Sequence, residues 1–576
     1  MLQDFIVEKN KYFIDGFNGD FVFLSSSPCS KFGGFFARLG NDWFRTISFI
    51  ENLECACCLE GGFYFRADGD VFLDCRRIFD LRAWGRHYVV SIKGNHFGNV
   101  EDYCVVVRFS KVNDPKEPSG EEYSLFLAIR GDFSFSLSEE WVKHEYPFDL
   151  ERNSPPFSRF VFRLGRISGS ACMSVSFDEA DAVKKVKILH ESLDKLLLQK
   201  ELVVESFAEG IKDVVPVLPV KSVKSAKLRK TAVNKSPDFM TAAAAAAARS
   251  LFSLSYDDSL LAGIPWFVYS WARDELISSK ALFLLGKKDF AKRIVFKWLD
   301  RLSGINLRTP LGIMSDSWWL FLRAEEMLDS LNRSEKTKLK RVLKDNLKKI
   351  VLSNGIVLNG PDQSTWMDSL ERRGALEVNA LVLAGCRLAD VLKIKNFGKE
   401  LRADVRKIFF RDGRLKDCVG CVGGNVVRPN VFIAAYVYPE LLSRKEWCEV
   451  FDNALRTLWL PWGGLSTIDK SSSLFHKTHT GENPESYHNG DSWFWINNLA
   501  AIVLHRFGKK RFSFYINKIA EASSKEILKM GAIGHHAELS DAQKLSSKGC
   551  LSQAWSAALF VELMFELSKS KTKKVK

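Results

Sequence analysis

Short apolar runs recur along roughly the first 180 residues of the chain, and polar or glycine-containing segments separate them. Examples are FVFL (21–24), HYVVSI (87–92), CVVVRFS (104–110) and SLFLAI (124–129). This pattern is typical of an antiparallel β-sandwich. It also predicts two hairpins, one turning at Asp68-Gly69 within FYFRADGDVFL and one joining CVVVRFS to SLFLAI.

The periodicity changes at about residue 181, where apolar residues begin to recur at the three- and four-residue spacing of a helix. A segment with three prolines and a basic tract follows at 216–239, and we interpret it as an exposed linker. From about 237 to 567 the pattern is helical almost throughout, beginning with seven alanines at 242–248. About twelve helices fit an α/α toroid of six helical hairpins, although periodicity alone fixes only the all-α class.

We therefore expect a multidomain α+β protein with four parts. These are an N-terminal antiparallel β-sandwich (1–180), a helix with a basic linker (181–236), an all-α (α/α)6 toroid (237–567) and a basic tail (568–576).

The net charge of +14 is concentrated in two short tracts. Six basic residues lie between 221 and 235, five lysines lie between 569 and 576, and neither tract contains an acid. The rest of the chain is therefore nearly neutral. We expect a solvated linker and tail, and this distribution argues against nucleic acid as a partner.

The expected compartment is the cytoplasm. The first ten residues contain no apolar segment of a secretory signal, and no apolar run reaches the ~18 residues that span a bilayer. The twelve cysteines are scattered rather than arranged as a disulfide framework, so we expect mostly reduced thiols and no membrane partner. Cys418 and Cys421 lack a second ligand pair at zinc spacing, and no phosphate-binding glycine motif is present, so we expect no metal and no cofactor.

Tryptophans in polar loops point to carbohydrate chemistry. Twelve of the fifteen tryptophans follow residue 237, and several lie in loops beside a carboxylate or an arginine. Sugar rings stack on indole through their CH faces and form hydrogen bonds to Asp, Asn and Arg. Nucleobases could stack on the same residues, but acids outnumber bases in these loops, which disfavours a polyanion.

Six motifs in order resemble the amylo-α-1,6-glucosidase domain of glycogen debranching enzymes, particularly the short archaeal and bacterial type. The motifs are PWFVYSWARDELIS (265–278), STWMDS (364–369), RRGALEVNAL (372–381), VRPN (427–430), SYHNGDSWFW (486–495) and AELSD (537–541) with SQAWS (552–556). The chain departs from the family pattern at Ala272, at Asn489 and in the residues after Gly490.

The resemblance implies an inverting, exo-acting glycoside hydrolase that releases glucose from α-1,6 branch points, as in glycogen breakdown. The implied partners are glycogen, limit dextrin and maltooligosaccharides. The implied general acid is Asp368 and the implied general base is Glu538. The implied substrate-binding residues are Trp266, Arg273, Asp274, Trp366, Glu377, Arg428, Asn430, His488 and Trp493.

The environments expected for the two acids differ. Asp368 follows two large apolar residues, so partial burial would raise its pKa and keep it protonated, while the polar loop around Glu538 suits an ionised base. Glu377 has a second interpretation, as a buried structural acid paired with Arg372 or Arg373.

Two alternatives to the leading function remain open at this stage. A glucoamylase or trehalase-like α-glucosidase of the same toroid superfamily would use the same residue types. A non-catalytic glycan- or RNA-binding protein would have lost the acids, and the presence of Asp368 and Glu538 at their motif positions argues against it.

Overall fold

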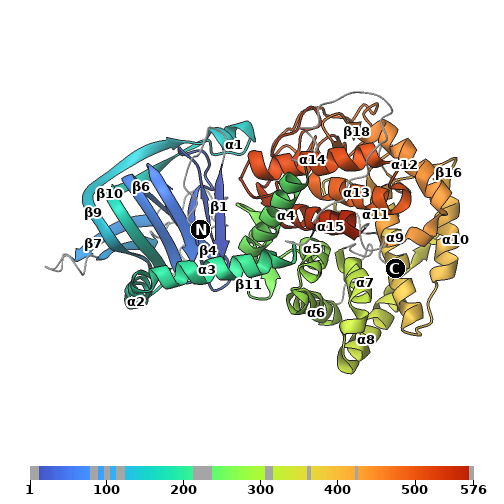
Figure 1. Cartoon of the computed structure of the whole chain (residues 1–576), viewed down its shortest axis with the longest axis horizontal. Helices are drawn as coiled ribbons and strands as arrows, with labels where there is room; N and C mark the ends of the chain where they lie inside the picture. Colours follow the sequence, from blue (N-terminus) through green and yellow to red (C-terminus); the bar gives the residue numbers. More distant parts are fainter. Residues whose placement is uncertain are drawn as a thin grey trace. The chain divides into compact units, whose positions relative to one another are not determined.

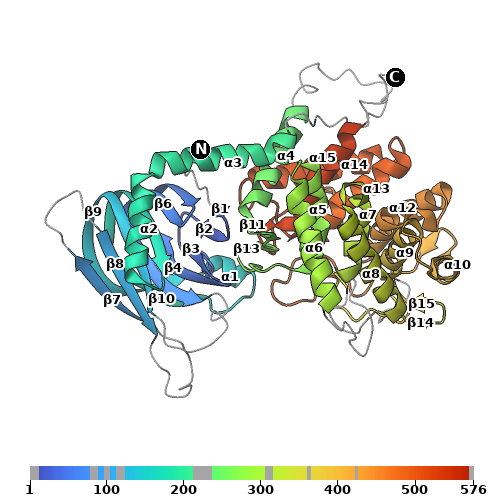
Figure 2. The ribbon, with the colours of Figure 1, turned by 90° about the horizontal axis from the view of Figure 1, so that it is seen from below.

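A computed structural model describes residues 12–77, 88–95, 104–111, 124–211, 214, 236–304, 316–359, 365–421 and 426–569. The chain divides into two compact units (Figures 1 and 2). Unit 1 comprises residues 1–206, 252–257 and 263–268, and unit 2 comprises residues 207–251, 258–262 and 269–576. The basic tract at 221–235 and residues 570–576 of the basic tail lie outside the described residues.

Unit 1 is built on one antiparallel sheet of ten strands. Hydrogen bonds link the strands in the order β1-β2-β3-β4-β6-β10-β9-β8-β7, and β5 pairs with β6. The strands are β1 (Phe13–Phe17), β2 (Asp20–Leu24), β3 (Gly34–Leu39), β4 (Asp42–Ile50), β5 (Leu53–Leu59), β6 (Gly62–Arg77), β7 (Tyr88–Asn95), β8 (Cys104–Lys111), β9 (Ser124–Glu145) and β10 (Ser158–Ser176).

The antiparallel arrangement confirms the sequence prediction, but the strands form one continuous sheet rather than two separately hydrogen-bonded sheets. The strands β6, β9 and β10 contain 16, 22 and 19 residues, which is long enough for one strand to serve two regions of a folded sheet. A bulge between Arg163 and Gly165 shifts the register of β10 against both of its neighbours. Apolar side chains from both ends of the sheet, such as Val22 and Val107, then share one core.

The hairpin predicted at Asp68-Gly69 is wrong. Strand β6 runs straight through these residues, and they pair with Ser168 and Ile167 of β10. The turn lies earlier, between Leu59 and Gly62, where Gly61 has a φ of +84° that favours glycine. The second predicted hairpin is present, because β8 and β9 pair antiparallel from Cys104↔Arg130 to Ser110↔Ser124.

Helices complete unit 1 on the outer face of the sheet. Ala182, Val186 and Leu189 of α2 (Glu179–Glu191) pack against a second apolar cluster formed by β5, β6, β8, β9 and β10. The helix α3 (Leu193–Ala208) carries the buried Lys200. Its Nζ donates to Asp15 Oδ2 at 2.5 Å and to the Cys58 carbonyl at 2.7 Å. A short helix, α1 (Pro147–Glu151), precedes β10.

Unit 2 is helical, and twelve α-helices begin in it between residues 236 and 569 of the described chain. They are α4 (Ser236–Ser253), α5 (Ala272–Leu284), α6 (Lys288–Gly304), α7 (Asp316–Glu326), α8 (Arg333–Lys349), α9 (Leu376–Val391), α10 (Gly398–Phe409), α11 (Asn430–Val437), α12 (Arg444–Leu458), α13 (Phe494–Gly508), α14 (Ser513–Lys529) and α15 (Ala554–Ser568). Short antiparallel strand pairs lie in several of the connecting loops.

Six of these helices contact one another in a closed series: α5 with α7, α7 with α9, α9 with α11, α11 with α13, α13 with α15, and α15 with α5. Figure 1 shows α6, α8, α10 and α12 outside this ring. The ring helices α9, α11, α13 and α15 are buried on nearly all sides, so their sequences are apolar all round rather than amphipathic. The outer helices keep a polar face.

The C-terminal halves of five ring helices, α5, α7, α11, α13 and α15, contribute to an ionic cluster, which we call the C-terminal cluster: Lys280, Arg323, Glu326, Tyr436, Arg506, Glu562 and Glu566. Tyr436 of α11 donates to Glu562 of α15 at 2.7 Å and accepts from Lys280 of α5 at 3.1 Å. In the ring α11 is a neighbour of neither α15 nor α5, so the Tyr436 side chain reaches across its interior. The N-terminal ends therefore meet at the opposite end of the ring.

No helix in the described parts of the chain is both long enough and apolar enough to cross a bilayer.

Candidate active site

Asp368 lies in the loop before α9, in contact with the first turn of α5. Arg273 Nη2 donates to Asp368 Oδ2 at 3.2 Å, and Arg273 Nη1 donates to the Thr365 carbonyl at 3.0 Å. Arg273 is nearly buried, whereas 35% of the Asp368 side chain is exposed. The guanidinium thus holds both the carboxylate and the backbone that carries it, and part of the carboxylate stays open to solvent.

Glu538 lies in the loop after α14 and is 2% exposed. Its Oε1 accepts a hydrogen bond from the Tyr487 hydroxyl, and its Oε2 accepts one from the Cys550 backbone N–H at 2.8 Å. Gly549 has a φ of +65°, and a Cβ atom there would collide with Glu538 Oε2. Both carboxylate oxygens are therefore oriented by donors, and the glycine leaves room for them.

The two acids belong to one site. The backbone N–H of Phe494 donates to the Glu538 carbonyl at 3.2 Å, and β20 (Ser492–Trp493) pairs with β21 (Leu539–Ser540). Burial is the main reason that the pKa values of Glu538 and Tyr487 are raised, and the charge of Asp368 raises both further. The Ser369 hydroxyl, next to Asp368, lies 2.7 Å from His488 Nδ1, and Tyr487, next to His488, donates to Glu538, so the two carboxyl groups lie near each other.

The environments of the two acids are the reverse of those expected from the sequence. Burial raises the pKa of Glu538 to about 7, although the Tyr487 and Cys550 hydrogen bonds act in the opposite direction. Trp366 and Met367 are themselves buried, so Asp368 points away from them toward Arg273.

Glu377 begins α9 and is engaged by a buried network, which we call the Arg372 network. Arg372 donates to Glu377 at 2.5 and 2.9 Å and to Asp417 at 2.8 and 2.9 Å. Asn430 also donates to Asp417, at 2.7 Å, and Arg372 reaches the Thr365 hydroxyl at 3.2 Å. These contacts match the structural interpretation of Glu377, and they connect the network to the loop that carries Asp368.

The predicted aromatic residues of the site form a packed cluster. Trp366 contacts Trp493 edge-to-face at a centroid distance of 5.5 Å, and His488 stacks on Trp493 at 5.2 Å. All three are at most 4% exposed. The Trp366 indole N–H donates to Asn430 at 2.6 Å, and the Trp493 indole N–H donates to the Tyr487 carbonyl at 2.8 Å. In the described structure these rings hold the loops together and expose little surface to a ligand.

Arg428 is likewise directed at neighbouring loops. Its guanidinium donates to the Thr467 carbonyl at 3.0 Å, to the His488 carbonyl and to Asn489 Oδ1 at 2.8 Å. Burial lowers the pKa of Arg428 to about 10. This residue therefore fixes the 486–491 turn, which includes Tyr487.

Asp274 and Trp266 lie in different units of the structure. Asp274, in the first turn of α5, accepts from Gln553 Nε2 at 3.0 Å at the start of α15. Trp266 belongs to unit 1, where the Arg152 guanidinium lies 3.5 Å from its ring centroid and Phe32 packs beside it. The structure brings Trp266 together with these residues of unit 1.

Sequence reasoning missed Tyr487 and the Cys550 backbone N–H, which hold Glu538, and Asp417, which holds Arg372. Tyr487 lies inside the SYHNGDSWFW motif, next to His488. This position is the sequence signal that could have identified it. Asp417 lies in no quoted motif, and only the fold brings it to Arg372.

One group among the described residues has donor atoms close enough to hold a metal ion: Asp417, Cys418 and Cys421. The two sulfur atoms are joined in a disulfide, and the Asp417 oxygens accept from Arg372 and Asn430. All three donors are thus engaged. This disulfide is an exception to the expectation of reduced thiols, since nine other described cysteines are free.

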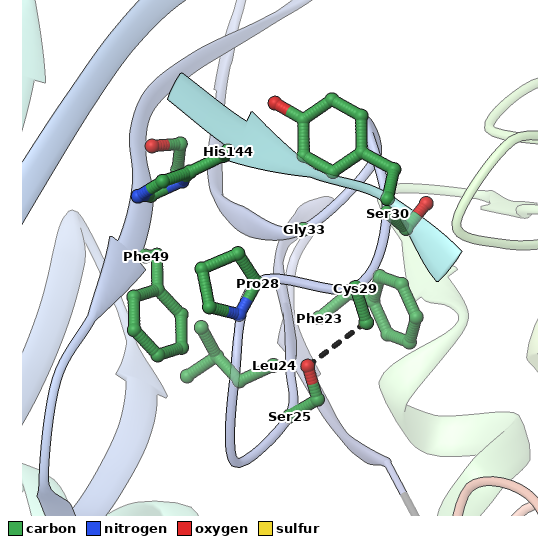
Figure 3. Close-up of a pocket in the computed structure, with 11 residues that line it drawn as sticks. Phe23, Leu24, Ser25, Pro28, Cys29, Ser30, Gly33, Phe49 and His144 are labelled. Atoms are coloured by element: carbon green, nitrogen blue, oxygen red, sulfur yellow. Dashed lines mark hydrogen bonds between the residues drawn. The ribbon is translucent and has the colours of Figure 1, made fainter. Parts of the chain in front are cut away.

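A separate small cavity in unit 1 is too small to hold a sugar (Figure 3). It has a volume of about 10 Å³, which is roughly that of one water probe. The Ser25 hydroxyl donates to Cys29 Sγ at 2.8 Å on its wall. Burial raises the pKa of the Cys29 thiol to about 12 and lowers the pKa of His144 to about 4, so neither group is charged near neutral pH.

Comparison with known families bears on the helical unit. Residues 337–562 match the amylo-alpha-1,6-glucosidase family. The resemblance inferred from the motifs is therefore confirmed for this segment, which contains Asp368 and Glu538. Residues 337–562 thus resemble a glycosidase domain over less than half of the chain.

Solved structures give distant matches. A glycosidase in complex with glucose has 12% identity and a TM-score of 0.42, covering 57% of this chain and 96% of its own. A GH63 mannosylglycerate hydrolase from Thermus thermophilus has 13% identity and a TM-score of 0.41, covering 56% of this chain and 99% of its own. A glucoamylase from Hypocrea jecorina has 12% identity and a TM-score of 0.37, covering 54% of this chain and 67% of its own. Curated proteins give no significant match.

Proposed function

We propose that the chain is an inverting, exo-acting glycoside hydrolase that releases glucose from α-1,6 branch points of glycogen-like α-glucans. The observation that carries the proposal is the meeting of Asp368 and Glu538 at the N-terminal end of the helical ring, inside the segment that matches the family. Glycoside hydrolysis needs two carboxyl groups that flank the scissile bond. We further propose that the ring is the (α/α)6 toroid of residues 237–567.

In the proposed reaction Asp368 protonates the leaving oxygen and Glu538 removes a proton from the attacking water. The hydrogen bonds from Tyr487 and the Cys550 backbone stabilise the ionised form of Glu538 and aim its lone pairs. A pKa of about 7 makes this carboxylate a stronger base than an ordinary glutamate. Arg273 and Asp274, in the first turn of α5, are the proposed partners of the glucose hydroxyls.

Substrate choice is tested by product analysis. We expect glucose release from a branched limit dextrin to exceed release from maltose and from trehalose, with β-glucose as the first anomer seen by proton NMR. Faster release from maltose than from isomaltosyl stubs would favour a glucoamylase instead. An initial α-anomer would contradict the inverting mechanism.

The roles of the two acids are tested with α-glucosyl fluoride, whose leaving group needs no proton. Asp368→Asn should lose ~10²–10⁴-fold on a glucan yet keep most of its rate on the fluoride. Glu538→Gln should lose both activities. If Glu538→Gln keeps the fluoride rate and Asp368→Asn does not, the roles are reversed, in agreement with the more buried position of Glu538.

A further inference from the structure

A histidine and an aspartate form a buried pair beside the candidate catalytic residues. His479 Nδ1 lies 2.7 Å from Asp491 Oδ2, and the Ser486 hydroxyl donates to the same oxygen at 2.7 Å. Asp491 is 0% exposed, and 7% of the His479 side chain is exposed. Because the Nδ1 edge points at a buried carboxylate, the exposed part of the ring is on the Nε2 side.

The pair shares its backbone with the residue that holds Glu538. The turn at 486–491 is closed by hydrogen bonds from the backbone N–H groups of Asn489 and Asp491 to the Ser486 carbonyl, at 3.0 and 2.9 Å. The same turn projects Tyr487 onto Glu538. The Ser486 hydroxyl donates to Asp491, and the next residue, Tyr487, donates to Glu538, so one short turn holds both the His479–Asp491 pair and the Glu538 carboxyl group.

Loop packing does not account for the pair. Asp491 Oδ1 is buried without a hydrogen-bond partner among the described residues, which is costly for a carboxylate. Asp491 also lies in the short segment after Gly490, where the chain departs from the family pattern.

We propose that His479, oriented by Asp491, is a substrate-contacting residue whose Nε2 forms a hydrogen bond with a hydroxyl group of the sugar bound beside Glu538. The inference rests on the proposed function and deepens it, since it assigns a specificity-determining contact to this chain's own loop. Nε2 has no hydrogen-bond partner within the described part of the chain.

The chemistry fits a neutral, hydroxyl-bearing ligand. With Nδ1 held by the carboxylate, a neutral imidazole offers Nε2 as an acceptor and an imidazolium offers it as a donor. A sugar hydroxyl both donates and accepts, so it can pair with either form. The carboxylate fixes the ring plane and therefore the direction of the contact.

The experiment compares His479→Gln with the matched variant His476→Gln, which changes another histidine three residues away in the same loop. Initial rates are measured on isomaltosides in which one hydroxyl at a time is replaced by hydrogen. On the parent sugar, His479→Gln should lower kcat/KM about threefold to tenfold, the range expected for one lost hydrogen bond. His476→Gln should leave it within about twofold, because this half-buried loop residue lies outside the proposed contact.

The decisive readout is selectivity among the deoxy sugars. One deoxy analogue should be cut equally well by wild type and by His479→Gln, because neither can make the missing contact. A uniform loss on all analogues would overturn the proposal and indicate that the pair only stabilises the loop. Asp491→Asn, with nearly the same shape, should show a weaker version of the same selective pattern, and a uniform pattern there would also count against the proposal.

Binding separates this inference from the proposed function. Calorimetry measures the affinity of wild type and His479→Gln for glucose and for the imino sugar 1-deoxynojirimycin, at a temperature where circular dichroism shows both folded. Wild-type binding without hydrolysis would overturn the proposed function, and weaker binding by His479→Gln alone would still support the contact. Equal binding by the two proteins, or none by either, would overturn it.

Discussion

Glu538 and Asp368 illustrate how neighbouring carboxyl groups acquire different properties from their surroundings. Glu538 is enclosed and held by two donors, and burial raises its pKa to about 7. Asp368 is more exposed and paired with Arg273. Local sequence could not predict this contrast, because Tyr487, Cys550 and Arg273 reach the acids from other loops and helices.

Tyr487→Phe tests the role of the hydroxyl that donates to Glu538. Removing a donor to the carboxylate destabilises the ionised form, so the pKa of Glu538 should rise above its present value of about 7. The acid limb of the kcat/KM profile should therefore move to higher pH. Tyr515→Phe, in α14 against Trp459, serves as the control and should leave the profile unchanged. A Tyr487→Phe profile that coincides with wild type would refute this role.

Glu538→Gln should change how stability depends on pH. The pKa of Glu538 is raised from 4.5 to about 7 on folding, so the folded wild type binds an extra proton between these values and loses stability as pH rises through them. The variant lacks this titration. Its stability relative to wild type should grow by up to about 3 kcal/mol between pH 4.5 and pH 7 and then level off. Urea unfolding at pH 5 and pH 8 measures the difference, and a constant difference would contradict the burial argument.

At the scale of elements, the hydrophobic pattern predicted most of the helices. The outer helices are amphipathic and show helical periodicity, and the ring helices are long apolar segments. It failed at Asp68-Gly69, where a turn-forming pair continues a long strand. Gly69 is needed there because a Cβ atom would press within 2.6 Å of the Glu51 carbonyl oxygen. Close approach and turn formation both select glycine, and only the pairing with β10 distinguishes them.

The site was predictable to the extent that its residues follow one another in motifs. Asp368 and Glu538 were identified by their motif positions. Their proximity in space depends on the fold and could not be predicted from their spacing in the sequence. Trp366, His488 and Trp493 were expected to contact the substrate, yet packing buries them. An aromatic ring beside a polar loop has the same local sequence whether it binds a ligand or packs in the core.

Glu377→Gln should separate support from catalysis. Losing the charge leaves Arg372 buried with Asp417 as its remaining acid, and we expect a stability loss of about 1–3 kcal/mol. Activity at temperatures where the variant is folded should fall far less than in Glu538→Gln. Glu371→Gln, on the exposed side of the same loop, should change stability by less than about 0.5 kcal/mol. An inactive but fully stable Glu377→Gln enzyme would instead assign chemistry to Glu377.

At the scale of the whole chain, charge is segregated from the folded units. Deleting residues 569–576 removes five lysines, and in the folded part it removes the surface pair of Lys569 with Glu566, in which Lys569 is 63% exposed. We expect unchanged glucose release from soluble oligosaccharides and a stability change below about 1 kcal/mol. Loss of activity on these small substrates would show that the tail takes part in the site.

The C-terminal cluster has a consequence for how a polymer is handled. Lys280, Arg323, Tyr436 and Glu562 are joined by hydrogen bonds across the ring at the end opposite the acids, so under the proposed function we expect that a glucan does not thread through and advance. Product and remaining chain must both leave by the mouth through which the substrate entered. The enzyme should therefore be distributive, with one cleavage for each encounter. Early in a reaction on a branched dextrin, chromatography should find many polymers shortened by one glucose; a few extensively trimmed polymers beside untouched ones would indicate processive action.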